Sequence, residues 1–200
     1  MTAGAKKLTT KDKILNAASE EFDLQGFDGA TVSDIRARAG VSNGSFFHAF
    51  STKEELAASL YLANLETYHQ AMTQSLDEVT SAAEGVKALI EAHMGWVLSH
   101  KASARFLFEQ AKSDWMKSSK PDQQQSNERF REALAKWYEP LMTSGELMRL
   151  SPHALIAQII GPAQLICRGW LSGRDDTDPK NHLDDLITCA VRAIVRNDPA

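Results

Sequence analysis

Residues 40–50, GVSNGSFFHAF, gather small hydrogen-bonding side chains in a tract without a single Asp, Glu, Lys or Arg. Serine hydroxyls and the exposed amide hydrogens at a helix start can hold phosphate oxygens without a positive charge. An asparagine side chain offers both a donor and an acceptor, as contact with base edges requires. The tract therefore has groups that could contact a nucleic acid.

Individual residues of this region suit different parts of such a contact. Asn43 could read base edges, Gly44 lets the backbone approach a duplex closely, and His48 could reach a base or a phosphate. Ser42 and Asn43 also fit ordinary turn and cap chemistry, which does not compete with DNA contact. The hydroxyls suited to phosphates are those of Thr31, Ser42, Ser45 and Thr52.

Helices must position these residues, because apolar residues recur at three- and four-residue steps and alternating strand patterns are missing. We expect an all-α fold of about nine helices, with capping pairs such as Thr31–Asp34 and Thr52–Glu55 at their starts. The predicted spans are 10–26, 31–39, 42–49, 52–79, 81–100 and 102–117, then a polar connection at 118–127, a helix presenting Phe130 to Leu141, and two final helices that start at Pro152 and Pro179.

Residues 10–56 have the layout of a helix-turn-helix DNA reader. The run ILNAASEEFDLQGFDGATVSDIRARAGVSNGSFFHAFSTKEEL closely resembles the N-terminal domain of the tetracycline-repressor (TetR) family of transcriptional regulators, over about a quarter of the chain. The matching positions are Ile14-Leu15, Ala17-Ala18, Phe22, Gly26-Phe27, Thr31-Val32, Asp34-Ile35, Ala39-Gly40-Val41-Ser42, Gly44, Phe50 and Lys53-Glu54.

The resemblance implies that the third helix enters the major groove and that a homodimer sets two such helices roughly 34–36 Å apart on a palindromic operator. Lys53 matches a family lysine that meets a phosphate. Phe47 and Ala49 depart from the family pattern, which usually has tyrosine and histidine there; Phe47 keeps apolar contact but lacks the phosphate-binding hydroxyl. The expected DNA-binding residues are Thr31, Ser42, Asn43, Gly44, Ser45, Phe47, His48, Thr52 and Lys53.

We expect two domains, a helix-turn-helix domain at 1–51 and a helical inducer-binding and dimerisation domain at 52–200. The first begins with a basic arm that carries Lys6, Lys7, Lys11 and Lys13. The helix that starts at Pro152 is apolar on nearly all sides. The resemblance implies that the two last helices form a four-helix bundle between subunits; packing within one domain is the alternative. The expected interface residues are Ile159, Pro162, Ile166, Trp170, Ile187, Val191 and Ile194.

The helices between these two regions are rich in large apolar and aromatic side chains. The resemblance implies that they surround a pocket for a small-molecule inducer, whose binding would release the operator. Apolar walls suit such a pocket, but they suit an ordinary helical core equally well. The expected pocket residues are His93, Trp96, Phe106, Phe130 and Trp137.

Composition excludes several other classes. The net charge of −4 and a pI near 5.9 argue against a protein coated in basic residues. The two cysteines and six histidines have no recognised metal or catalytic spacing, so we expect no metal, no cofactor and no enzyme activity. The chain lacks a long uninterrupted apolar run, so we expect a cytoplasmic protein without a membrane partner. The rival to a ligand-released repressor is a helical protein-interaction module without sequence-specific DNA binding.

Overall fold

The computed structural model describes residues 8–196, and within them it confirms the all-α prediction, with nine α-helices. Two short 3-10 helices, η1 and η2, interrupt the series. The helices are α1 Thr10–Gly29, α2 Val32–Ala39, α3 Asn43–Ala49, α4 Lys53–Gln74, α5 Ala82–Ser99, α6 Lys101–Gln110, η1 Asp114–Ser119, α7 Lys120–Ser144, α8 Pro152–Leu171, η2 Pro179–His182 and α9 Leu183–Ile194.

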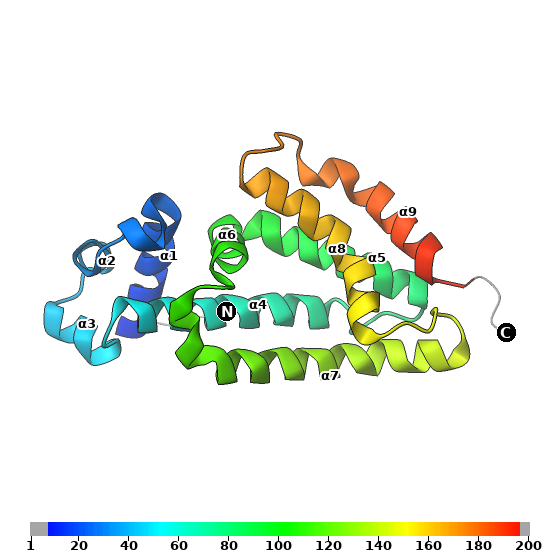
Figure 1. Ribbon diagram of the computed structural model, residues 1–200, viewed down its shortest axis with the longest axis horizontal. Helices are drawn as coiled ribbons and strands as arrows, with labels where there is room; N and C mark the ends of the chain where they lie inside the picture. Colours follow the sequence, from blue (N-terminus) through cyan, green and yellow to red (C-terminus); the bar gives the residue numbers. More distant parts are fainter. Residues whose placement is uncertain (1–7, 197–200) are drawn as a thin grey trace, which may run out of the picture.

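Helices α1, α2 and α3 lie together at one end of the elongated molecule, and α4 runs from them along the second group of helices, α5 to α9 (Figure 1). Helix α7 lies along one side of α4, and α5 lies along the other. Helices α8 and α9 cover the outer side of α5 and pack against each other (Figure 1). The order is therefore α7, α4, α5 and then the α8–α9 pair, with the buried core between these layers.

Local side-chain chemistry starts several of these helices as the sequence predicts. The hydroxyl oxygens of Thr31, Ser42 and Thr52 accept hydrogen bonds from backbone amides three residues later, at 3.2, 3.1 and 3.0 Å. Each cap of this kind stabilises a helix by about 1 kcal/mol. Helix α2 ends at Gly40, whose φ of 64° is in the left-handed region that glycine tolerates best. The turn between α2 and α3 is therefore specified by local residues.

Two predicted helix ends are wrong, and a third is only partly right. The predicted end at Gly26 coincides with a kink, where Gly26 has φ 72°, and a further helical stretch continues to Gly29. Helix α4 stops at Gln74 rather than near residue 79, and turns follow. The expected helix 102–117 is α6 followed, after a short turn, by η1. Apolar periodicity continues across these points, so the sequence pattern alone does not reveal the breaks.

The polar tract 118–127, expected to be a surface connection, largely belongs to α7. Pro121 lies in the first turn, where a missing amide hydrogen costs nothing. Gln123 Nε2 donates to the Tyr61 hydroxyl at 3.3 Å, and Ser126 Oγ lies 3.1 Å from His69 Nδ1. These contacts with α4 account for the order of a segment whose composition favours a loop.

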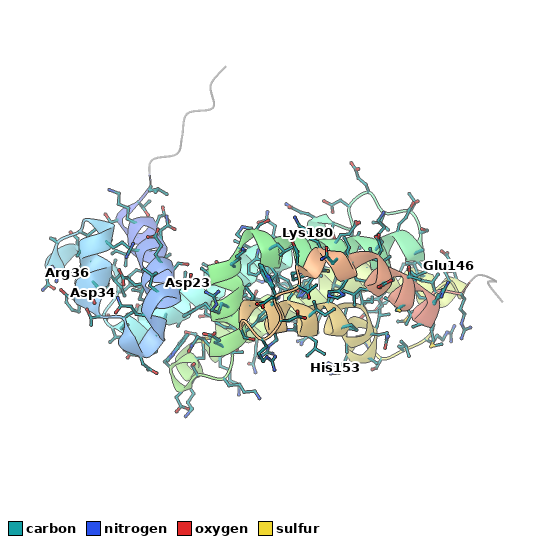
Figure 2. The ribbon with its side chains drawn as sticks, turned by 90° about the horizontal axis from the view of Figure 1, so that it is seen from above. Asp23, Asp34, Arg36, Glu146, His153 and Lys180 are labelled. Carbon is teal, nitrogen blue, oxygen red and sulfur yellow. The ribbon has the colours of Figure 1, made fainter. Side chains whose placement is uncertain are left out.

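Four aromatic rings join the N-terminal helices to the second group, and we call them the junction cluster: Phe22, Phe27, Phe106 and Trp115. The ring of Phe22 on α1 stacks on that of Phe106 on α6, with centroids 5.4 Å apart. Phe27 and Trp115 lie 5.3 Å apart. An ion pair between Asp23 and Arg105 spans the same boundary, and Asp23 lies on the side of α1 that faces α6 (Figure 2). The two helix groups are thus tied by both apolar and charged contacts.

Helix α8 is, within the described residues, the one helix long and apolar enough to cross a membrane by length and composition alone. Core helices of water-soluble proteins can have the same length and apolar composition. Leu165 is the large apolar side chain of α8 with the greatest exposure, 68%, and α8 lies beside α9 on one face of the molecule (Figure 2). An exposed apolar face of this kind is typical of a surface that another protein covers.

Candidate nucleic-acid interface

Helix α3 is held in place by aromatic residues that point into the N-terminal core. Phe46 is fully buried and Phe50 is 2% exposed, while Ile35 of α2 is fully buried in the same core. The rings of Phe46 and Phe50 lie 6.3 Å apart. These contacts fix the orientation of a helix with only seven residues, and so decide which of its side chains face outward.

The outward side of α3 carries the residues predicted to contact DNA. Asn43, Gly44, Phe47 and His48 are all exposed, and the Phe47 side chain is 49% accessible. Ser42 and Ser45 are exposed too, but their hydroxyls bond each other at 2.9 Å while Ser42 caps the helix. The structure thus gathers these six residues at one surface: Ser42, Asn43, Gly44, Ser45, Phe47 and His48.

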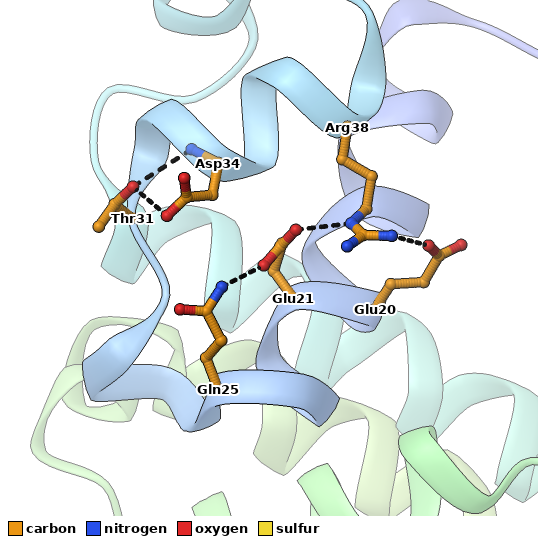
Figure 3. A network of polar contacts seen from close by, with 6 residues as sticks. All are labelled: Glu20, Glu21, Gln25, Thr31, Asp34 and Arg38. Carbon is orange, nitrogen blue, oxygen red and sulfur yellow. Dashed lines mark hydrogen bonds and ion pairs between the residues drawn. The ribbon is translucent and has the colours of Figure 1, made fainter.

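Thr31 and Thr52 lie at the starts of the two neighbouring helices. The hydroxyl of Thr31 donates to Asp34 Oδ2 at 2.6 Å while accepting from the Asp34 amide (Figure 3). Both threonines are exposed. Their cap hydrogen bonds keep a hydroxyl at the surface on each side of α3, and these contacts agree with the capping that the sequence predicts.

A buried carboxylate ties α2 to α1 behind this surface. Glu21 is 4% exposed, and its two oxygens accept from Arg38 Nε and Gln25 Nε2, each at 2.6 Å (Figure 3). Arg38 also donates to Glu20 at 2.8 Å. The hydrogen bonds to Glu21 and Glu20 raise the pKa of the Arg38 guanidinium above its usual value. Arg38 therefore positions α2, and its charge is already balanced within the domain.

Lys53 has a different role from the one that the resemblance implies. Its ammonium group donates to the backbone oxygens of Phe27 at 2.8 Å, Ala30 at 3.0 Å and Asp28 at 3.5 Å. It also lies 4.5 Å from the centre of the Phe27 ring. A lysine ammonium has three donors, so these bonds use its whole capacity. In this structure Lys53 clamps the end of α1 to the start of α4 instead of presenting its charge to a phosphate.

Other basic residues remain near the N-terminal end. Lys11 and Lys13 are exposed on α1, and the Lys11 ammonium lies 5.4 Å from the centre of the Phe50 ring. Lys6 and Lys7 of the expected basic arm lie outside the described residues.

Sequence analysis missed the buried Glu21 network. Glu21 shares the face of α1 that carries the buried Ile14 and Ala18, and a carboxylate on an apolar helix face needs a partner. The place of Glu21 on this apolar face was the one feature of the sequence that could have revealed a buried polar contact. The partner itself, Arg38, could not be identified without knowing how α2 packs across α1.

The predicted pocket residues separate into groups in the second helix group. His93 and Trp96 are buried on α5, and the ring of Tyr68 on α4 contacts them both and Phe130 of α7. Tyr68 Oη lies 2.9 Å from His93 Nδ1, and burial lowers the pKa of His93 to about 4. Side-chain nitrogens of three residues are buried in this region without a hydrogen-bond partner among the described residues: Asn64 Nδ2, His93 Nε2 and Trp96 Nε1.

The other two predicted pocket residues lie elsewhere. Phe106 belongs to the junction cluster, where it stacks on Phe22. Trp137 packs its indole edge on Gly85 and lines an open cavity of about 510 Å³ between α7 and the turns that follow α4, beside Leu76 and Pro140. The structure therefore brings together His93, Trp96 and Phe130 around Tyr68, but not Phe106 or Trp137.

The predicted dimer residues also divide, and two expectations need correction. Ile159 and Ile194 are 1% and 2% exposed, so they face the core of their own subunit and cannot supply free interface. Leu165, which the prediction missed, is the most accessible apolar side chain on α8. Pro162 is exposed, and the half-buried members of the predicted set are Ile166, Trp170, Ile187 and Val191.

Comparison with known proteins shows two likenesses, one in the sequence of the N-terminal domain and one in the fold. Residues 14–60 match the family model described as bacterial regulatory proteins, tetR family. The HTH-type transcriptional regulator LmrA of Bacillus subtilis is 31% identical over 83 residues, which are 41% of this chain and 44% of LmrA. The HTH-type transcriptional repressor KstR2 of Mycolicibacterium smegmatis is 32% identical over 82 residues, which are 41% of this chain and 40% of KstR2. The chain thus aligns with less than half the length of these relatives.

The fold extends the likeness beyond the N-terminal domain. The crystal structure of FadR from Bacillus subtilis in complex with stearoyl-CoA superposes with a TM-score of 0.76, covering 90% of this chain and 96% of that chain at 19% identity. At this identity the likeness concerns the fold. Residues 14–60 therefore form a DNA-binding domain of the tetR family of bacterial regulatory proteins, and the chain as a whole has the fold of the TetR-family structures that it resembles.

Proposed function

We propose that this protein is a transcriptional regulator that binds a palindromic DNA operator as a homodimer and releases it when a small molecule binds the second domain. The observation that carries the proposal is the outward side of α3, where six exposed residues, five of them small or polar, are held on a rigid frame inside a TetR-type domain. Helix-turn-helix proteins insert such a helix into the major groove.

The uncharged surface of α3 suits base reading with the phosphate contacts made around it. Asn43 and His48 are the side chains able to pair with base edges, and Phe47 can contact thymine methyl groups. The hydroxyls of Thr31 and Thr52, on either side, and the amides at the start of α3 supply phosphate contacts. We assign the electrostatic contribution to Lys11, Lys13 and the residues before them, because the Lys53 ammonium is already bonded.

The ligand site that we propose lies between α4 and α5, around His93, Trp96 and Tyr68. Unpaired buried nitrogens are costly, so a ligand that supplies an oxygen acceptor to them gains free energy by binding there. An open cavity of about 380 Å³ between α4 and α7 is lined by His69 and Phe130, and the Phe130 ring contacts Tyr68. We propose that α4, α5 or α7 moves to extend this cavity to the buried nitrogens. Movement of α4 shifts the DNA-reading helices, because Lys53 and the junction cluster join α4 and α6 to α1.

The dimer surface that we propose is the exposed face of α8 and α9, centred on Leu165 and Pro162. Self-complementary helix faces of this kind form twofold interfaces. Leu165→Glu is expected to give monomers in sedimentation analysis. Leu24 on α1 is a matched control, because it is also 68% exposed but lies outside α8 and α9. Monomeric wild-type protein, or equal dissociation by Leu24→Glu, would refute the assignment of this surface.

DNA selection from a random pool tests the central proposal. Enrichment of one palindrome, bound with an affinity that falls steeply as salt rises, is the expected result. Asn43→Ala should relax the preference at one base position in each half-site, whereas Asn16→Ala, on an exposed part of α1, should leave it unchanged. Failure to enrich any sequence would favour the rival proposal, a helical protein-interaction module.

Our proposal also places the protein in the cytoplasm, without enzyme activity.

A further inference from the structure

A small cavity lined by arginines lies between the second half of α6 and the end of α8, on the side of the molecule that carries the Asp23–Arg105 ion pair. Its volume is about 290 Å³, at the lower end of the range of ligand sites. We call it the arginine pocket. It is lined by Arg105, Phe108, Glu109, Arg168, Leu171, Ser172 and Arg174.

Two of its arginines have no acidic partner in the part of the chain that the structure describes. Arg168 lies over the ring of Phe108, 5.5 Å from its centre, and donates a 3.4 Å hydrogen bond to the Phe108 backbone oxygen. Arg174 Nε donates to Ser172 Oγ at 3.2 Å. Neither guanidinium forms an ion pair with a carboxylate there. Most of their donors are therefore left for a ligand.

The third arginine connects this pocket to the DNA-reading domain. Arg105 on α6 forms the ion pair with Asp23 on α1, across the boundary that the junction cluster spans. A guanidinium has five donors but one positive charge, so an anion in the pocket competes with Asp23 for it. Glu109 is the acid on the pocket wall, against three arginines. The pocket is thus positively charged overall, in a chain whose net charge is −4.

We propose that the arginine pocket binds the phosphate group of an organic phosphate, and that the bound anion draws Arg105 away from Asp23. Guanidinium groups match phosphate oxygens in bidentate geometry, and three of them suit a doubly charged group better than a single carboxylate. Phe108 and Leu171 supply apolar walls for the adjoining carbon skeleton. Loss of the Asp23 contact loosens α1 from α6, so the site is a second regulatory input besides the buried α4–α5 site. This coupling rests on the proposed DNA binding, whereas anion binding itself does not.

Calorimetric titration of the full chain without DNA tests the binding step, with inorganic pyrophosphate as the probe at constant ionic strength. We expect saturable binding at one site per chain, weakened about tenfold or more by Arg168→Gln or Arg174→Gln, as the loss of a charge-assisted hydrogen bond predicts. Arg131→Gln removes the same charge from α7, where Arg131 pairs with Glu128, and should have no effect. Equal affinity in all three variants, or no saturable binding, would overturn the proposal. Tighter binding of acetate than of pyrophosphate would overturn the phosphate assignment.

The coupling has its own test in Asp23→Asn, which leaves Arg105 without its partner. This variant should bind pyrophosphate several-fold more tightly than the wild type, because the anion no longer competes with Asp23. Pyrophosphate should weaken operator binding by the wild type, and operator should weaken pyrophosphate binding by the same factor. An operator affinity unchanged by saturating pyrophosphate would refute the coupling. If no operator is found, the titrations without DNA still decide whether the pocket binds phosphate.

Discussion

Replacement of Lys53 by methionine separates the clamp seen in the structure from the phosphate contact implied by resemblance. Methionine keeps the apolar part of the side chain but removes the ammonium group. Three hydrogen bonds to the backbone oxygens of Phe27, Asp28 and Ala30 are lost, and with them the contact over the Phe27 ring. A hydrogen bond to a charged group contributes about 1.5–3 kcal/mol and an exposed cation–π contact about 0.5–1 kcal/mol.

The expected loss for Lys53→Met is about 2–3 kcal/mol of unfolding free energy, since the longest of the three bonds adds little and water replaces part of the rest. For a chain of this size that corresponds to a fall in Tm of roughly 5–10 °C. Differential scanning calorimetry measures the loss. The second readout is the slope of log operator affinity against log salt, which the clamp predicts to stay unchanged.

A lysine that contacts a phosphate behaves in the opposite way. Its removal flattens the salt slope by about one unit while leaving stability nearly unchanged. Lys13→Met is the matched control, because Lys13 is an exposed lysine near the start of α1 and is expected to act in that way. A salt slope flattened by Lys53→Met, together with an unaltered Tm, would refute the clamp.

Three further predictions concern other parts of the molecule. A Cβ at Gly85 would lie 2.3 Å from Trp137 Nε1, so Gly85→Ala should lower the free energy of unfolding by about 1–3 kcal/mol and alter tryptophan fluorescence. Gly95→Ala is the control, because a Cβ there meets no neighbour within 4 Å, and it should be neutral or stabilising. Equal effects of the two substitutions would contradict the assigned packing. Burial holds the pKa of His93 at about 4, so as pH falls the unfolded chain takes up a proton on His93 before the folded chain does. The contribution of neutral His93 to stability is therefore lost between about pH 6.5 and 4. The free energy of unfolding in urea should fall between pH 7 and pH 5 by about 1–2 kcal/mol more in the wild type than in His93→Gln. Phe47→Tyr adds a phosphate-binding hydroxyl to a half-exposed ring. It should tighten operator binding, measured by an anisotropy titration, without changing Tm. Weaker or equal binding would argue against a DNA contact at this position.

Residues close in sequence specified much of the N-terminal domain. Thr31, Ser42 and Thr52 cap helices through amides only three residues away, and Gly40 supplies the left-handed turn between α2 and α3. Such interactions depend on a few neighbouring residues, so a sequence pattern can reveal them without knowledge of packing. The TetR resemblance extended this local information to the orientation expected of α3.

Contacts between distant segments were decided only by the tertiary structure. Lys53 bonds to backbone oxygens 23–26 residues earlier, and Arg38 reaches Glu21 over 17 residues. The burial of Ile159 and Ile194 within the subunit, while Leu165 is exposed, depends on how α8 and α9 rotate against α5. Apolar periodicity shows that a helix has a buried face, but not which partner covers it, because any apolar surface gains similar free energy from burial. The sequence by itself therefore determined most of the helices, their caps and the TetR-type N-terminal domain. Packing decided which side chains are clamps, which are core and which remain available for binding.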